Sequence, residues 1–220
     1  MRLLRLLIIL FLPLVMVVPA SATLIFNYNI EFSGGTPPAS ATTPWLTATF
    51  EQQGANVVRL TMTATHLTGS EFVTEWDFNF NPSKSLLPLG IGSHDISDLP
   101  SVVLSQMVDA YKADGDGFFD IMFSLPTSGS GNRFDAGTTI WVDFQASGLL
   151  EADFNFLSAP GGGPGSFLSA AHVQGIGTGG NFSGWVAPGN GGEVPEPISL
   201  ILLGSGLAGA GLYRRFRKSR

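Results

Sequence analysis

Cysteine is absent from the 220-residue sequence, and histidine is scarce. Without cysteine the chain can form no disulfide scaffold, cysteine zinc finger, iron–sulfur site or thiol nucleophile. The three histidines, His66, His94 and His172, occur in no His-x-His or His-Glu-x-x-His spacing that would bring two of them to one face for zinc. A Gly-x-Ser-x-Gly motif for a serine nucleophile is also missing. We therefore predict that the protein is not an enzyme.

Positive charge is scarce in the middle of the chain. The sequence has 11 Lys and Arg residues, but seven of them lie at the two ends. Residues 23–193 carry four cations against sixteen acids, which is a formal net charge of −12. Binding to phosphate backbones needs clustered Lys and Arg, so this body is not expected to bind nucleic acid.

The first 22 residues have the pattern of an export signal. Arg2 and Arg5 precede a continuous apolar run at 6–18, and Ala20-Ser21-Ala22 has the small-x-small pattern that signal peptidase accepts. This pattern predicts a signal peptide over residues 1–22, with Thr23 as the first residue after cleavage. The alternative is an uncleaved anchor, but thirteen apolar residues as a helix extend only about 20 Å. The hydrocarbon core of a bilayer is roughly 30 Å thick.

Three features follow one another at the other end of the chain. A Gly-rich linker at 188–193 leads to Pro195-Glu196-Pro197, and a mostly apolar segment at 198–213 predicts a single transmembrane helix about 24 Å long. Five cations follow this segment: Arg214, Arg215, Arg217, Lys218 and Arg220. Cations flanking a membrane helix remain in the cytoplasm, so the body is expected on the opposite side of the membrane.

Together, the Pro-Glu-Pro sequence, the short apolar helix and the cationic tail of residues 194–220 resemble the PEP-CTERM sorting signal of Gram-negative bacteria. The resemblance implies recognition by an exosortase near Pro195-Glu196-Pro197 and removal of the helix. It also implies a transient single-pass precursor in the inner membrane and delivery to the cell surface or extracellular matrix, often in association with exopolysaccharide. The alternative is an ordinary membrane anchor that is never cut, in which the small residues of 204–211 could pack two helices together.

The body shows the period-two alternation of β-strands. Alternating apolar and polar residues occupy short segments bounded by Gly, Pro, Asn or Ser, at 24–32, 46–51, 58–65, 72–80, 119–125, 139–145 and 154–156. One apolar and one polar face per strand is typical of antiparallel sheets. We therefore predict an all-β, antiparallel β-sandwich or jelly-roll body over residues 23–187. Only residues 99–112 also fit a short helix.

The best candidate for a metal site is Asp114-Gly115-Asp116-Gly117-Phe118-Phe119-Asp120. Carboxylates at alternate positions with intervening glycines suit calcium, and Asp114, Asp116 and Asp120 would be the ligands. In the register of an EF-hand loop, however, Lys112 and Phe123 take the first and twelfth ligand positions. The sequence therefore predicts at most weak calcium binding, with a plain polar turn as the alternative, and no other cofactor.

Two further patterns suggest carbohydrate chemistry. Glu75 and Asp77 are two residues apart on one strand, about 7 Å by strand rise, a separation like that of the carboxylates of inverting glycosidases. Any alternating acidic strand produces the same spacing, so a solvated polar face is favoured. Trp141 lies out of phase with its apolar neighbours, so it is expected on the outer face, where it could stack on a sugar ring or pack at an edge.

The sequence thus predicts an exported, non-catalytic surface or matrix protein, handled by signal peptidase and exosortase. A secreted carbohydrate-binding module that uses Trp141 is the alternative. A secreted hydrolase is disfavoured by the missing catalytic motifs.

Overall fold

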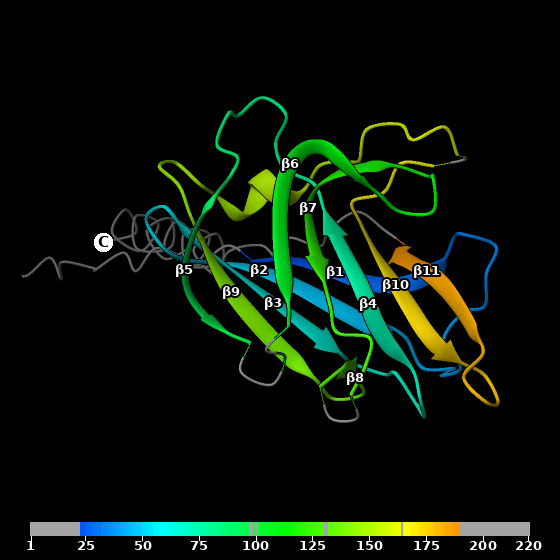
Figure 1. The fold of residues 1–220 in the computed structure, drawn as a ribbon. Helices are drawn as coiled ribbons and strands as arrows, with labels where there is room; N and C mark the ends of the chain where they lie inside the picture. Colours follow the sequence, from blue (N-terminus) through cyan, green and yellow to red (C-terminus); the bar gives the residue numbers. More distant parts are fainter. Residues whose placement is uncertain (1–22, 97–98, 100, 130–131, 164, 190–220) are drawn as a thin grey trace, which may run out of the picture. The chain divides into compact units, whose positions relative to one another are not determined.

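The computed structural model describes residues 23–189, apart from 97–98, 100, 130–131 and 164. These residues form eleven strands and one 3₁₀ turn (Figure 1). The elements are β1 (Thr23–Glu31), β2 (Leu46–Gly54), β3 (Val57–Ala64), β4 (Phe72–Phe78), β5 (Gly90–Asp95), β6 (Val103–Lys112), β7 (Phe118–Ser124), β8 (Phe134–Asp135), β9 (Thr139–Gln145), η1 (Glu151–Phe154), β10 (Ser169–Ile176) and β11 (Phe182–Pro188). The all-β prediction is confirmed.

All eleven strands belong to one antiparallel sheet. Its order is β5-β9-β3-β2-β1-β11-β10-β4-β7-β6, and β8 pairs with the start of β4. The first and last strands of the chain, β1 and β11, pair with each other in the middle of this order. The antiparallel prediction is confirmed, whereas a sandwich of two separate sheets is not, since hydrogen bonding continues from edge to edge.

The sheet curls, so that its two halves share one core. Phe123 of β7 lies 6.5 Å from Phe144 of β9 between ring centroids, although these strands are near opposite ends of the sheet order. Phe50 of β2 contacts Phe78 of β4 at 5.4 Å. Phe154 of the 3₁₀ turn stacks on Phe50 at 4.3 Å and fills the space between the halves. Burying these rings from water is the main stabilisation of such a core.

Alternation along the strands assigns residues to the core as the sequence predicts. In β3 the inward residues Val58, Leu60, Met62 and Ala64 are buried, and the intervening residues are half-buried. By contrast, the short-helix interpretation of residues 99–112 is wrong. Residues 103–112 form β6, which pairs with β7 at the edge of the sheet. The irregular apolar spacing arises because the pairing is interrupted between Gln106 and Tyr111, where Asp109 has a φ of 50°.

Several predicted segments fall outside the described residues: the signal peptide (1–22), the linker from residue 190 onward, and the sorting signal (194–220) with its transmembrane helix (198–213). Within the described part of the chain, none of the helical segments has the length and apolar character needed to cross a bilayer. Strand β1 begins at Thr23, the residue that cleavage after Ala22 would leave first.

Candidate functional site

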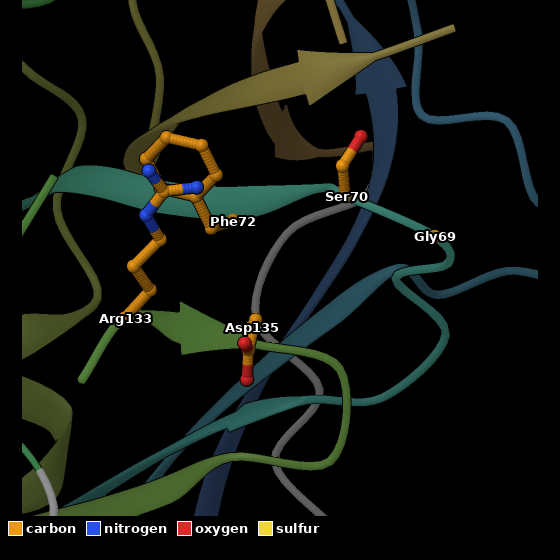
Figure 2. Close-up of a pocket in the computed structure, with 5 residues that line it drawn as sticks. All are labelled: Gly69, Ser70, Phe72, Arg133 and Asp135. Carbon is orange, nitrogen blue, oxygen red and sulfur yellow. The ribbon is translucent and has the colours of Figure 1, made fainter. Parts of the chain in front are cut away.

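A hollow on the body lies where the start of β4, the short strand β8 and the turn between β10 and β11 meet. It consists of two cavities, of about 510 and about 250 Å³, that share Ser70, Phe72 and Arg133 as lining residues. Gly69 and Asp135 complete the smaller cavity (Figure 2). The larger cavity is also lined by Thr127, Gln174, Gly175, Gly179, Gly180, Asn181, Phe182 and Ser183.

Local chain geometry holds these walls together. The Ser70 hydroxyl donates to the Gly175 carbonyl oxygen at 2.7 Å, which ties the turn before β4 to the end of β10. Gly175 has a φ of +74°, and a Cβ atom there would lie 2.1 Å from the Ser70 carbonyl oxygen. Only glycine accommodates both this left-handed backbone and this close approach. β8 pairs with the first two residues of β4, which brings Arg133 and Asp135 to the same place.

Arg133 is the electrostatic centre of the hollow. Its guanidinium carbon lies 4.1 Å from the centroid of the Phe72 ring, a cation–π contact. Its Nε is buried and has no hydrogen-bond partner among the described residues, where Arg133 also forms no ion pair. Figure 2 shows the Asp135 carboxylate pointing away from the guanidinium, and this carboxylate accepts a hydrogen bond from the Thr138 hydroxyl at 3.1 Å.

The residues predicted to bind calcium do not form a ligand set. In the described part of the chain, no three His, Cys, Asp or Glu side chains are grouped so as to hold a metal ion. Asp120 is buried, and its two oxygens accept hydrogen bonds from the backbone N–H groups of Phe80 and Asp109, both at 2.8 Å. Burial raises the pKa of Asp120 despite these two bonds. Asp114 is exposed in a tight turn with a φ of 45°, and Asp116 is buried against Gly163.

Trp141 lies on the outer face of β9, half-buried, with one face of its ring covered. The Arg59 guanidinium carbon lies 3.6 Å from the ring centroid. Arg59 also donates two hydrogen bonds to the Asp143 carboxylate, at 2.8 and 3.0 Å, which fixes the guanidinium in place. The register pairs Arg59 with Asp143 and Thr61 with Trp141, so this contact follows from the β3–β9 pairing. Sequence reasoning did not identify Arg59 as a partner of Trp141.

Glu75 and Asp77 are not both on a solvated face. Asp77 is fully buried, because the outer face of β4 and β10 carries a second small apolar cluster of Ala113, Phe119 and Ala170, and Ala170 pairs directly with Asp77. Burial, followed by the nearby Glu75 charge, raises the pKa of Asp77 well above its usual value. Burial also raises the pKa of Glu75. Within the described residues neither Asp77 oxygen accepts a hydrogen bond. A protonated Asp77 can donate one to Glu75.

His172 adjoins this acidic pair across the β4–β10 ladder, where it is the register partner of Glu75. Its ring stacks on Trp185 at 4.9 Å, and its Nδ1 lies 3.1 Å from the Thr74 hydroxyl oxygen. Burial lowers the pKa of His172, with a smaller opposing effect from the charge of Asp114. His172 is thus half-buried, with its ring stacked on Trp185 and its Nδ1 next to the Thr74 hydroxyl.

Sequence reasoning missed the Arg133 hollow. Its walls come from segments around residues 70, 133 and 180, which no local pattern connects. The one available signal was the scarcity of cations, since Arg133 is one of only four in the body. The predicted processing residues (Ala20, Ala22, Pro195, Glu196, Pro197 and the tail cations of 214–220) lie outside the described residues.

Comparison with known proteins identifies the C-terminal region. The family model of the PEP-CTERM protein-sorting motif matches residues 193–218. No curated protein and no solved structure matches the chain. The motif supports an exported protein that is targeted to an exosortase, through a membrane-anchored precursor, and delivered to the cell surface. The chain is therefore a PEP-CTERM domain-containing protein, with its sorting motif at residues 193–218.

Proposed function

We propose that this protein is a non-catalytic component of the cell surface or extracellular matrix, associated with exopolysaccharide. In this proposal signal peptidase cuts after Ala22, and the helix at 198–213 holds the precursor in the inner membrane. An exosortase then cuts near Pro195-Glu196-Pro197 and releases the body. The sorting motif at residues 193–218 is the observation that carries the proposal.

The Arg133 hollow supports a binding role rather than catalysis. Its lining residues include no histidine, and the Ser70 hydroxyl already donates to a backbone carbonyl. The usual activating base of a serine nucleophile is an adjacent histidine, and none lines these walls. The polar walls with two aromatic side chains, Phe72 and Phe182, are those of a recognition surface.

Processing is tested by changing both prolines of the motif, Pro195→Ala together with Pro197→Ala. Two prolines remove backbone donors and keep the segment out of the following helix, so the motif stays extended and accessible to an enzyme. We expect the double variant to accumulate as an uncut, membrane-bound form that retains the cationic tail. Mass spectrometry of membrane and surface fractions from an exosortase-containing strain measures this.

The matched control changes two exposed prolines of the body, Pro82→Ala with Pro160→Ala, and should be processed like the unmodified protein. Efficient trimming and release of the motif variant would contradict exosortase processing at Pro-Glu-Pro and leave an ordinary anchor.

A secreted carbohydrate-binding module is the second candidate, favoured by the outward position of Trp141. Because Arg59 covers one face of the Trp141 ring, a sugar could stack only on the opposite face. A glycan-binding screen with Trp141→Ala tests it. A secreted hydrolase, the third candidate, draws on the Glu75–Asp77 pair, and a panel of glycoside substrates tests that activity.

A further inference from the structure

We propose that the hollow around Arg133 binds the carboxylate group of an acidic saccharide. This inference rests on the proposed association with extracellular polysaccharide and specifies its chemistry. Nothing in the sorting motif indicates a ligand for the body, so the proposal depends on the geometry of the hollow.

The first step is the charge of Arg133. A guanidinium with a buried, unpartnered Nε has lost hydration without gaining a hydrogen bond, an unfavourable arrangement in the ligand-free protein. The Arg133 side chain as a whole is only half-buried and lines both cavities, so the rest of its planar guanidinium can donate two parallel hydrogen bonds to the oxygens of a carboxylate in the hollow. Within the larger cavity Arg133 is the only charged lining residue, so no protein carboxylate competes there.

The second step is the rigidity of the guanidinium. Its plane lies over the Phe72 ring at 4.1 Å, and Phe72 is itself buried at the start of β4. The donors are therefore held in place before the ligand arrives, which lowers the entropy cost of binding. Arginine at a stacked site of this kind is not replaceable by lysine.

The third step assigns the rest of the ligand. The remaining walls offer amide and hydroxyl groups, from Gln174, Asn181, Thr127 and Ser183, which suit sugar hydroxyls. Phe182 is 56% exposed at the rim and offers a ring on which a sugar can stack. A volume of about 510 Å³ lies within the range of small-molecule sites. A peptide ligand would need apolar pockets for its side chains. Phe72 and Phe182 are the only large apolar residues in these walls, so the hollow suits a saccharide better than a peptide.

The fourth step concerns Asp135 in the smaller cavity. Its carboxylate faces away from Arg133 and can accept a hydrogen bond from a sugar hydroxyl (Figure 2). The negative charge of Asp135 also disfavours a second anionic group of the ligand in the smaller cavity. The hollow therefore suits one carboxylate flanked by hydroxyl groups, as in a uronic acid residue.

The test is calorimetric titration of the full chain, purified in detergent, with trigalacturonate. Its fully methyl-esterified form keeps the shape and removes the charge, and triglutamate presents carboxylates on a peptide. We expect binding of trigalacturonate only, weakened about tenfold or more by Arg133→Gln. Phe182→Ala, at an exposed position that does not affect folding, should weaken binding severalfold through lost stacking. Lys112→Gln removes an exposed cation outside the hollow and should leave binding unchanged.

Three outcomes would overturn the inference. Equal binding of the acid and its ester would remove the role of the carboxylate. Equal or tighter binding of triglutamate would identify a peptide site, and no binding of any probe would leave the hollow without this function. The Pro195/Pro197 processing assay does not depend on these results, so failure of this inference and failure of the proposed function can be told apart. Melting curves of each variant confirm that it is folded.

Discussion

Asp77 is the residue whose burial has the clearest consequence for stability. It carries a carboxyl group at 0% exposure beside a second carboxylate, and its pKa in the folded protein is well above the usual value of 3.8. Above about pH 4 the unfolded chain has already lost this proton while the folded protein retains it. Because the folded state then binds more protons, stability falls as pH rises towards the folded pKa.

We predict that Asp77→Asn removes this loss of stability. Wild-type protein should lose roughly 1.4 kcal/mol for each pH unit over which folded Asp77 stays protonated, and the variant should not. Urea unfolding of both proteins between pH 5 and pH 9 measures the difference. Asp143→Asn serves as control, since it breaks the ion pair with Arg59 and should be destabilising at neutral pH. A wild-type slope that persists in Asp77→Asn would show that another group causes it.

Tyr28 connects three elements through a buried chain of hydrogen bonds. The Trp76 indole N–H donates to the Tyr28 hydroxyl oxygen at 2.6 Å, and the Tyr28 hydroxyl is bonded to the Ser169 hydroxyl. The Ser169 hydroxyl in turn donates to the Asp77 carbonyl oxygen. Burial raises the pKa of Tyr28, so it remains a neutral hydroxyl throughout the accessible pH range.

We predict that Tyr28→Phe lowers the free energy of unfolding by about 1–3 kcal/mol, because the Trp76 N–H is left buried without an acceptor. Chemical denaturation with tryptophan fluorescence reports both the stability and the environment of Trp76. Tyr111→Phe, at a half-buried site in β6, is the matched control and should change stability by less than about 0.5 kcal/mol. Similar losses of unfolding free energy in the two variants would argue against a special role for the hydrogen bonds of Tyr28.

At the scale of elements, the β6–β7 hairpin depends on one carboxylate. Asp120 of β7 accepts the N–H of Asp109 at the interruption of β6 and the N–H of Phe80 just after β4. It therefore joins three strands at a point where regular pairing stops. Both of its oxygens accept backbone hydrogen bonds, and among the described residues Asp120 is not grouped with two other acidic side chains.

We predict that Asp120→Asn destabilises the protein by about 1–3 kcal/mol, because the amide NH₂ faces one of the two backbone donors. Asp114→Asn should be nearly neutral, since asparagine tolerates the left-handed backbone at that position. We also expect the melting temperature of the wild type to stay constant from chelator to about 10 mM calcium, the upper range of weak sites. A calcium-dependent rise that Asp116→Ala abolishes would instead establish a metal site in this loop.

At the scale of the whole body, one core joins both halves of the curled sheet. Phe154 stacks on Phe50 of β2, lies 5.6 Å from Phe144 of β9 and lies 5.5 Å from Phe80, which follows β4. We predict that Phe154→Ala costs about 3–5 kcal/mol. Hydrogen exchange should show that β2 and β4 lose protection together, because neither half keeps a complete core of its own.

Phe182→Ala is the control for this substitution, since the exposed ring leaves no cavity when removed and should cost less than about 0.5 kcal/mol. Loss of protection in β2 alone would show that the two halves of the sheet unfold independently.

Short patterns of consecutive residues in the sequence determined the sorting motif and the inward faces of the strands. The sorting motif is a short linear pattern, and the family match at 193–218 agrees with the resemblance over 194–220. The inward faces of strands such as β3 also follow from the sequence, because side chains of a strand alternate with a period of two whatever its neighbours are. Both signals lie within a few consecutive residues.

Only the tertiary structure decided the single curled sheet, the burial of Asp77 and the hollow at Arg133. The central pairing of β1 with β11 joins residues more than 150 positions apart, and no pattern within either strand specifies the other as its partner. Asp77 is buried because Ala170 and its cluster cover the outer face of β4, which alternation alone assigns to solvent. Arg133 meets Phe72, Gly175 and Phe182 only after the sheet has formed. Such features depend on which surfaces meet, and that follows from the packing of the whole core.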